Sequence, residues 1–114
     1  MPIIYKICPA DVWSAAEREG IFRGASVDLR DGFIHFSTAE QLAETVEKYF
    51  AGQDGLVLIA VDTASLGPAL VFEPSRHGAL FPHLYGELPL SAVDRVVPLP
   101  LGADGRHVLP ELIA

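Results

Sequence analysis

The stretch DGFIHFSTAEQLAETVEKYF, residues 31–50, decides how this chain can fold, because it predicts a strand that runs directly into a helix. The pair Asp31-Gly32 is a turn signal. Residues 33–37 follow it and are typical of a strand, in which successive side chains point to opposite faces. One face of this strand is apolar and suits the core. The other face carries a histidine and a serine and would line the opposite surface.

A helix over residues 39–50 is the clearest single element that the sequence predicts. Its apolar side chains recur at i, i+4, i+7 and i+8, which places them on one face of a 3.6-residue repeat. These residues are Leu42, Val46, Tyr49 and Phe50. Thr38 with Gln41, or Ser37 with Glu40, offers a capping box at the start of the helix.

Outward from this unit, the N-terminal side predicts a strand over Pro2–Cys8 and a helix that starts at Pro9 and stops near Gly20. An irregular segment carrying Arg23 and Asp28 follows. On the C-terminal side we expect mainly strands, at residues 56–62, 70–73, 83–85 and 94–99. The expected fold is α+β in a single domain of residues 1–114, with two helices in the N-terminal half and mainly strands in the C-terminal half.

Composition excludes several classes of protein. Eight Lys and Arg against fifteen Asp and Glu give a net charge of −7, which disfavours non-specific binding to nucleic acid or anionic lipid. No apolar run approaches the roughly 20 residues that cross a bilayer. The single Cys8 excludes an internal disulfide and a Cys-rich zinc site. We therefore expect a soluble cytoplasmic protein that takes a small-molecule ligand, if any, and the sequence leaves its oligomeric state open.

Polar side chains that could carry chemistry lie on three of the predicted strands. Because alternate residues of a strand share a face, they would line one surface if the three strands are neighbours in a sheet. The candidates are His35, Ser37, Glu73, His83 and Tyr85. A histidine and a carboxylate on one surface are suited to acid–base work or to holding a ligand hydroxyl.

Each candidate also has a plainer interpretation. His35 could be a half-buried strand histidine bonded to a backbone carbonyl, and Glu73 could be a surface carboxylate paired with Arg76. A zinc site formed by His35, His77 and His83 lacks any short ligand spacing, so we expect no metal. The aromatic string at residues 81–86 suits the lining of a ligand site as well as a core and a turn.

Three strings, in order along the chain, resemble the bacterial domain-of-unknown-function 952 (DUF952) family. They are IYKI at residues 4–7, DGFIHFSTAEQ at residues 31–41 and FPHLYG at residues 81–86. This resemblance implies a fold similar to that of the ADP-ribosyltransferases, which is a small split β-sandwich with a cleft for a nicotinamide dinucleotide.

The same resemblance implies roles for individual residues. In that superfamily an early strand supplies a His or Arg to the ribose hydroxyls, a later strand supplies a Ser or Tyr, and a late strand supplies the catalytic Glu. His35 matches the first role, and Tyr85 could stack on a nicotinamide-like ring. Glu73 and Glu87 are the late glutamates near the family strings, and neither stands in a Glu-x-Glu context.

The resulting hypothesis is a cleft that binds a nucleotide-like or ADP-ribose/NAD-like ligand, with ADP-ribosyl transfer as the chemistry if there is turnover. The predicted ligand-binding residues are His35, Ser37, Tyr85 and Arg76, and the predicted acid–base residues are Glu73 and His83. No cofactor is expected beyond an NAD-like ligand. A non-catalytic module that binds a protein or metabolite is the alternative. A hydrolase is the third hypothesis, and it requires His35 and Glu73 within about 3 Å, directly or through one water.

Overall fold

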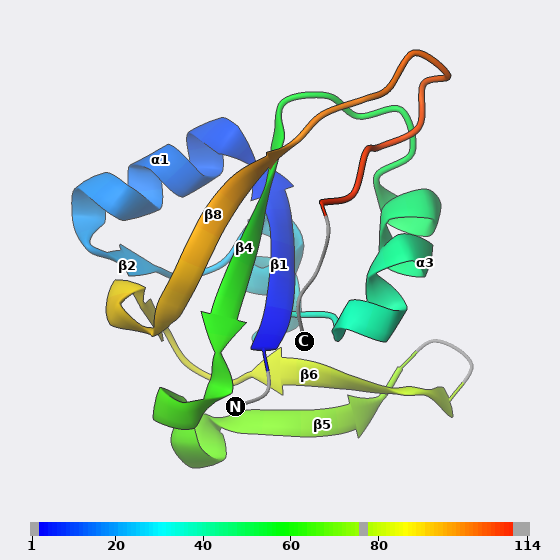
Figure 1. The fold of residues 1–114 in the computed structure, drawn as a ribbon. Coiled ribbons are helices and arrows are strands. Elements are labelled where there is room, and N and C mark those ends of the chain that lie inside the picture. The colour runs from blue at the N-terminus through cyan, green and yellow to red at the C-terminus, as the bar shows by residue number, and fades with distance from the viewer. Residues whose placement is uncertain (1–2, 76–77, 111–114) are drawn as a thin grey trace.

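The computed structural model describes residues 3–75 and 78–110, and it has the expected α+β architecture (Figure 1). In chain order the elements are β1 (Ile3–Pro9), α1 (Ala10–Glu19), β2 (Ile21–Phe22), α2 (Ser26–Asp31), β3 (Ile34–His35), α3 (Ala39–Tyr49), β4 (Leu56–Asp62), β5 (Leu70–Pro74), β6 (Leu80–Leu84), β7 (Leu88–Pro89) and β8 (Val93–Leu99), with 3₁₀ turns at Thr63–Ser65, Gly67–Ala69 and Leu90–Ala92. Pro2, predicted as the start of the first strand, lies outside the described residues.

Within the described residues the strands form three antiparallel sheets, with the orders β1-β4-β8, β3-β6-β5 and β2-β7. The strands of the first sheet run steeply across those of β5 and β6, while α1 and α3 lie on opposite sides of β1 and β4 (Figure 1). Antiparallel pairing suits this chain, because short connections can join neighbouring strands.

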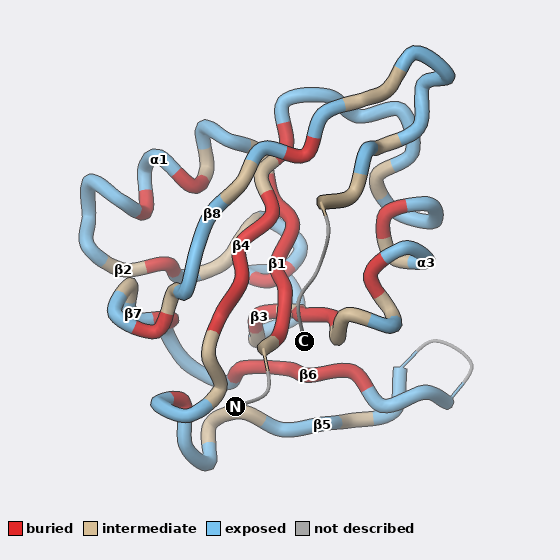
Figure 2. The backbone as a smooth tube through the Cα atoms, in the orientation of Figure 1, coloured by how far each residue is buried: buried red, intermediate tan, exposed pale blue. Residues whose placement is uncertain are grey.

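The central strand β4 is covered on both faces, as its continuous apolar sequence predicts. Leu56, Leu58 and Ala60 pack in the cluster that includes the buried face of α3. Ile59 and Val61 alternate with them and pack in the cluster that includes α1. Most residues of β1, β4 and β6 are accordingly buried, as Figure 2 shows. Period-two alternation therefore assigns one face of the sheet to each helix.

A third helix, α2, forms where the sequence predicts an irregular segment. The Asp28 carboxylate accepts the backbone N–H of Ala25 at 2.8 Å, which satisfies a donor just before the first turn. At the other end Gly32 adopts a left-handed conformation and donates its N–H to the Asp28 carbonyl at 2.8 Å. One aspartate thus supplies bonds at both ends of this short helix.

The strand predicted over residues 33–37 divides between two sheets. Only part of it pairs with β6 as β3. The N–H of Phe36 still bonds the Pro82 carbonyl at 3.0 Å, but Ser37 exchanges both backbone hydrogen bonds with Tyr5 of β1 at 2.8 and 2.9 Å. This short segment therefore ties the sheet containing β6 to the sheet containing β1.

The helix α3 begins as one of the two predicted capping boxes requires. Gln41 Oε1 accepts the N–H of Thr38 at 3.0 Å. The alternative box of Ser37 with Glu40 is not used, because the Ser37 hydroxyl instead bonds the Thr45 hydroxyl at 2.8 Å. Among the described residues no helix is long and apolar enough to cross a membrane.

Shortening a central side chain of β4 should destabilise the fold strongly. Ile59 has no exposed surface, so Ile59→Ala is expected to lower the free energy of unfolding by about 2–4 kcal/mol through lost burial and a residual cavity. Urea denaturation followed by Trp13 fluorescence measures this change. Val96, which is opposite Ile59 on β8 and 36% exposed, provides the control. Val96→Ala should cost less than about 1 kcal/mol, and equal losses would contradict the assignment of the core.

Candidate functional site

One face of the β3-β6-β5 sheet gathers side chains from distant parts of the sequence. Pairing places His35 directly opposite His83, and His83 directly opposite Val71. Tyr85 and Glu73 occupy the next positions on that same face. The three predicted strands are therefore neighbours, and four of the proposed site residues lie together on their shared face.

Glu73 is the centre of one hydrogen-bonded group on this face. Its Oε1 atom accepts the Tyr85 hydroxyl at 2.6 Å and Nδ1–H of His83 at 2.8 Å. The hydrogen bond from Tyr85, followed by that from His83, lowers the pKa of Glu73, and the same bond raises the pKa of Tyr85. Because Nδ1–H of His83 donates to Glu73, Nε2 is the ring nitrogen that can accept a hydrogen bond when His83 is neutral. Glu73 and His83, predicted as the acid–base residues, thus form a carboxylate–histidine pair.

Phe33 holds the rings of this face together. Its ring centroid lies 4.2 Å from that of His83, 4.5 Å from that of His35 and 5.1 Å from that of Tyr85. Tilted contacts at these separations are favourable and restrict the rotation of each ring. Phe33 is not among the predicted site residues, although its position two before His35 in the predicted strand over residues 33–37 places it on the same face.

A buried ion pair lies behind His35. The Lys6 Nζ atom is 2.7 and 2.9 Å from the two carboxylate oxygens of Asp28, and both residues are buried. Asp28 also accepts the backbone N–H of His35 at 3.0 Å and its Nδ1–H at 2.6 Å. Burial is the largest single influence on the Asp28 pKa and raises it. The His35 hydrogen bonds and the Lys6 charge together outweigh burial, so the pKa falls from 3.8 to about 2.

The second ring nitrogen of His35 also meets a carboxylate. Nε2 lies 3.0 Å from Oδ2 of Asp31, and Oδ1 of Asp31 is 3.0 Å from Nε of Arg30. The Arg30 hydrogen bond is the main reason why the pKa of Asp31 is lowered. When both carboxylate contacts form, both ring nitrogens of His35 act as hydrogen-bond donors. His35 is thus bonded to Asp28 and Asp31, whereas Glu73 is bonded to His83 and Tyr85, so the described residues show no direct hydrogen bond between His35 and Glu73.

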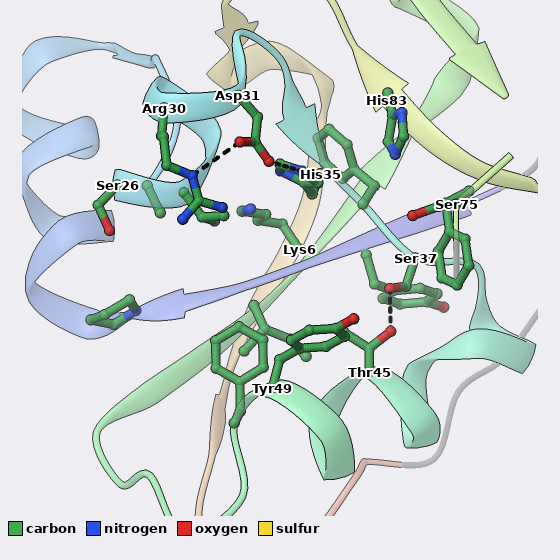
Figure 3. A pocket seen from close by; sticks show the side chains of 18 of the residues that line it. Lys6, Ser26, Arg30, Asp31, His35, Ser37, Thr45, Tyr49, Ser75 and His83 are labelled. Carbon is green, nitrogen blue, oxygen red and sulfur yellow. Dashed lines mark hydrogen bonds and ion pairs between the residues drawn. The ribbon is translucent and has the colours of Figure 1, made fainter. Parts of the chain in front are cut away.

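A pocket of about 580 Å³ opens beside these groups, between α2 and α3 and over β1 (Figure 3). Lys6, Arg30 and Asp31 contribute charged groups to its lining, and His35 and His83 contribute imidazoles. Hydroxyl groups of Ser26, Ser37, Thr45, Tyr49 and Ser75 line it as well. The pocket therefore combines hydrogen-bonding groups from β1, α2, β3, α3 and β6 with an otherwise apolar wall.

The predicted site residues divide into two groups around this pocket. His35, Ser37 and His83 line it, whereas Glu73 and Tyr85 do not and reach it only through His83. Arg76 lies outside the described residues, as does His77. No set of three or more His, Cys, Asp or Glu side chains within the described part of the chain is arranged to hold a metal ion.

The chain belongs to the family described as protein of unknown function (DUF952), whose sequence model matches residues 7–96. The crystal structure of protein CC0527 from Caulobacter crescentus is similar, with 51% identity, 93% of each chain covered and a TM-score of 0.88. The solution NMR structure of CC0527 matches with 52% identity, 93% of this chain and 91% of that chain covered, and a TM-score of 0.83. A comparison with curated proteins gives no match.

Neutralising Asp28 should destabilise the protein in a manner that depends on pH. In Asp28→Asn the buried Lys6 charge loses its partner, so we expect a loss of about 3–5 kcal/mol near neutral pH. Because the native pKa of about 2 lies below the ordinary value of 3.8, ionised Asp28 stabilises the fold above about pH 4. That contribution is lost as the pH falls towards 2.

Urea unfolding of wild type and Asp28→Asn at pH 7, 5 and 3 measures the effect. The difference between the two proteins should be largest at pH 7 and smaller at pH 3. Asp94→Asn, which changes an exposed carboxylate, serves as the control and should stay close to wild type at each pH. A difference that grows on acidification would contradict the role given to Asp28.

Proposed function

We propose that the pocket between α2 and α3 binds a nucleotide-like ligand of the ADP-ribose or NAD type. One observation carries this proposal: in a chain of net charge −7, a pocket of about 580 Å³ is lined by two cationic side chains, two imidazoles and several hydroxyls. Arg30 and the imidazoles face a single lining carboxylate, Asp31. Pockets of roughly 300–1,000 Å³ suit small organic ligands, and local positive charge attracts anionic ones.

His35 and Ser37 are the proposed polar contacts for oxygen atoms of the ligand. Because Asp28 holds Nδ1 of His35 inside the fold, Nε2–H is the donor that this ring can offer to a ligand. The Ser37 hydroxyl already bonds Thr45, and the two hydroxyls together form a polar patch on the α3 side of the pocket. Arg76 stays a predicted ligand contact.

His83 and Glu73 are the proposed acid–base pair. His83 lines the pocket, and Glu73 fixes the proton on Nδ1 so that Nε2 can accept a proton from a ligand or water. Tyr85 donates to the same oxygen of Glu73 and is not part of the pocket lining. We therefore assign Tyr85 the positioning of Glu73 in place of stacking on a ring of the ligand.

The ADP-ribosyltransferase-like fold and ADP-ribosyl transfer belong to this proposal. The crossing of the β1-β4-β8 and β3-β6-β5 sheets is consistent with a split β-sandwich. In such a reaction Glu73, the late glutamate, would act through His83, because its own carboxylate lies outside the pocket lining. A transferase in which Glu73 touches the substrate directly is not favoured.

Ligand binding should raise the melting temperature. At about 100 times its dissociation constant a ligand adds roughly 2.7 kcal/mol of stability, which is about 10 °C for a domain of this size. Differential scanning fluorimetry with ADP-ribose and with NAD tests this, and His35→Ala should reduce the ligand-induced increase. The proposal fails if neither ligand at millimolar concentration moves the melting temperature or the NMR signals of His35 and His83.

A non-catalytic interaction module is the alternative, and exposed apolar side chains favour it. On β5 and β6, Phe72 is 46% exposed and Leu80 is 53% exposed. If the chain is an enzyme, Glu73→Gln should retain ligand binding and lower the rate of nicotinamide release from NAD by about 100-fold or more, since acid–base catalysis contributes this much. Glu87→Gln is the matched control. Ligand binding with no nicotinamide release by the wild type would favour the module.

A further inference from the structure

The two carboxylates that bind His35 differ in how firmly they are held. The Asp28 side chain is completely buried and accepts hydrogen bonds from Lys6, from the backbone N–H of Ala25, and from the backbone N–H and Nδ1–H of His35. Asp31 is 32% exposed in its side chain and contacts His35 from the last residue of α2. Asp31 lines the pocket and Asp28 does not. One contact is therefore part of the core, and the other lies in the pocket wall.

The Asp31 carboxylate holds together two donors that also line the pocket. One oxygen meets Nε of Arg30, and the other meets Nε2 of His35, each at 3.0 Å. Figure 3 shows the three side chains in a row along the α2 side of the pocket. A guanidinium beside a histidine ring N–H is a donor set that binds phosphate or carboxylate oxygens. An oxyanion of a ligand could satisfy both donors as Asp31 does.

We propose that Asp31 occupies an oxyanion subsite formed by Arg30 and His35, and that the phosphate group of a ligand displaces it. This inference rests on the proposed function, because it places the phosphate of a nucleotide-like ligand in the same pocket. In the ligand-free protein the Asp31 carboxylate stands in for the phosphate and keeps both donors in position. The Asp31 contact therefore blocks the subsite, and at the same time it holds Arg30 and His35 in the positions that would bind a phosphate.

The surroundings of Asp31 allow the exchange. Its ion pairs are partly exposed to solvent, and such pairs contribute little to stability. Asp31 also sits at the C-terminal end of α2, where the helix dipole disfavours negative charge. Rotation of one side chain would release both donors without breaking the Asp28 contacts that orient His35. The diphosphate of such a ligand carries two negative charges, against one on the carboxylate that it replaces, and therefore attracts Arg30 more strongly.

The prediction for affinity has a definite sign. Removing the charge of Asp31 eliminates the internal competitor, so Asp31→Asn should bind both inorganic phosphate and ADP-ribose about tenfold more tightly than wild type, a change equal to about 1.4 kcal/mol. Isothermal titration calorimetry at low ionic strength measures both probes. Arg30→Gln should weaken both, and the double variant Asp31→Asn/Arg30→Gln should lose the gain.

The control removes one negative charge elsewhere. Asp94→Asn changes the net charge of the chain equally but lies outside this pocket, so its affinity should match that of wild type. Melting temperatures of all variants establish that they are folded. In NMR spectra, phosphate should shift the His35 Nε2 resonance and leave Nδ1 nearly unchanged, because Asp28 stays bound.

The outcomes separate the inference from the proposed function. If ADP-ribose binds but Asp31→Asn binds either probe no more tightly than wild type, the displacement of Asp31 is refuted and the proposed function stands. An equal gain in Asp94→Asn would trace the effect to net charge and likewise refute the subsite. If neither probe binds any variant, the subsite and the proposed function both fall.

Discussion

The carboxylate of Asp28 is the contact on which the arrangement of the site depends. It joins Lys6 on β1, Ala25 before α2 and His35 on β3, so three elements meet at one buried charge. A carboxylate removed from water is costly unless its oxygens are fully bonded, and here the bonds are sufficient to keep it ionised. Gly24 belongs to the same arrangement, since a Cβ atom there would lie only 2.7 Å from Cβ of Asp28. Asp28 therefore orients the ring of His35, which lines the pocket, from within the core.

The second determinant of the site is the register of an antiparallel sheet. Because His35 is opposite His83, one face collects rings that are almost fifty residues apart in the sequence, and Phe33 packs against them. A register shift by one residue would turn every one of these side chains to the other face. The opposite face carries Ile34 and Leu84, both of which belong to the core. Core packing and site geometry therefore enforce the same register.

Periodicity predicts much of this fold, and the reasons are visible in particular residues. The apolar run of β4 and the repeat in α3 reflect burial directly, and alternation predicts that His35, His83, Tyr85 and Glu73 share one face if their strands are neighbours. The role of Asp28 could not be read in this way, because its partners come from three separate segments. A lysine at position 6, within an otherwise apolar strand, signals that a buried counter-charge exists but not which carboxylate supplies it. The exclusion of Glu73 and Tyr85 from the pocket lining depends on side-chain direction in three dimensions.

The segment from β3 to Ser37 also has a mechanical consequence. Phe36 is bonded to β6 and Ser37 is bonded to β1, so adjacent residues belong to different sheets. His35 and His83 belong to one sheet, whereas Lys6 belongs to the other, and the cavity between α2 and α3 spans this junction. A displacement of the β1-β4-β8 sheet relative to the β3-β6-β5 sheet would therefore change the width of the cavity. The segment from β3 to Ser37 therefore fixes the spacing of the two sheets, and with it the width of the cavity that they share.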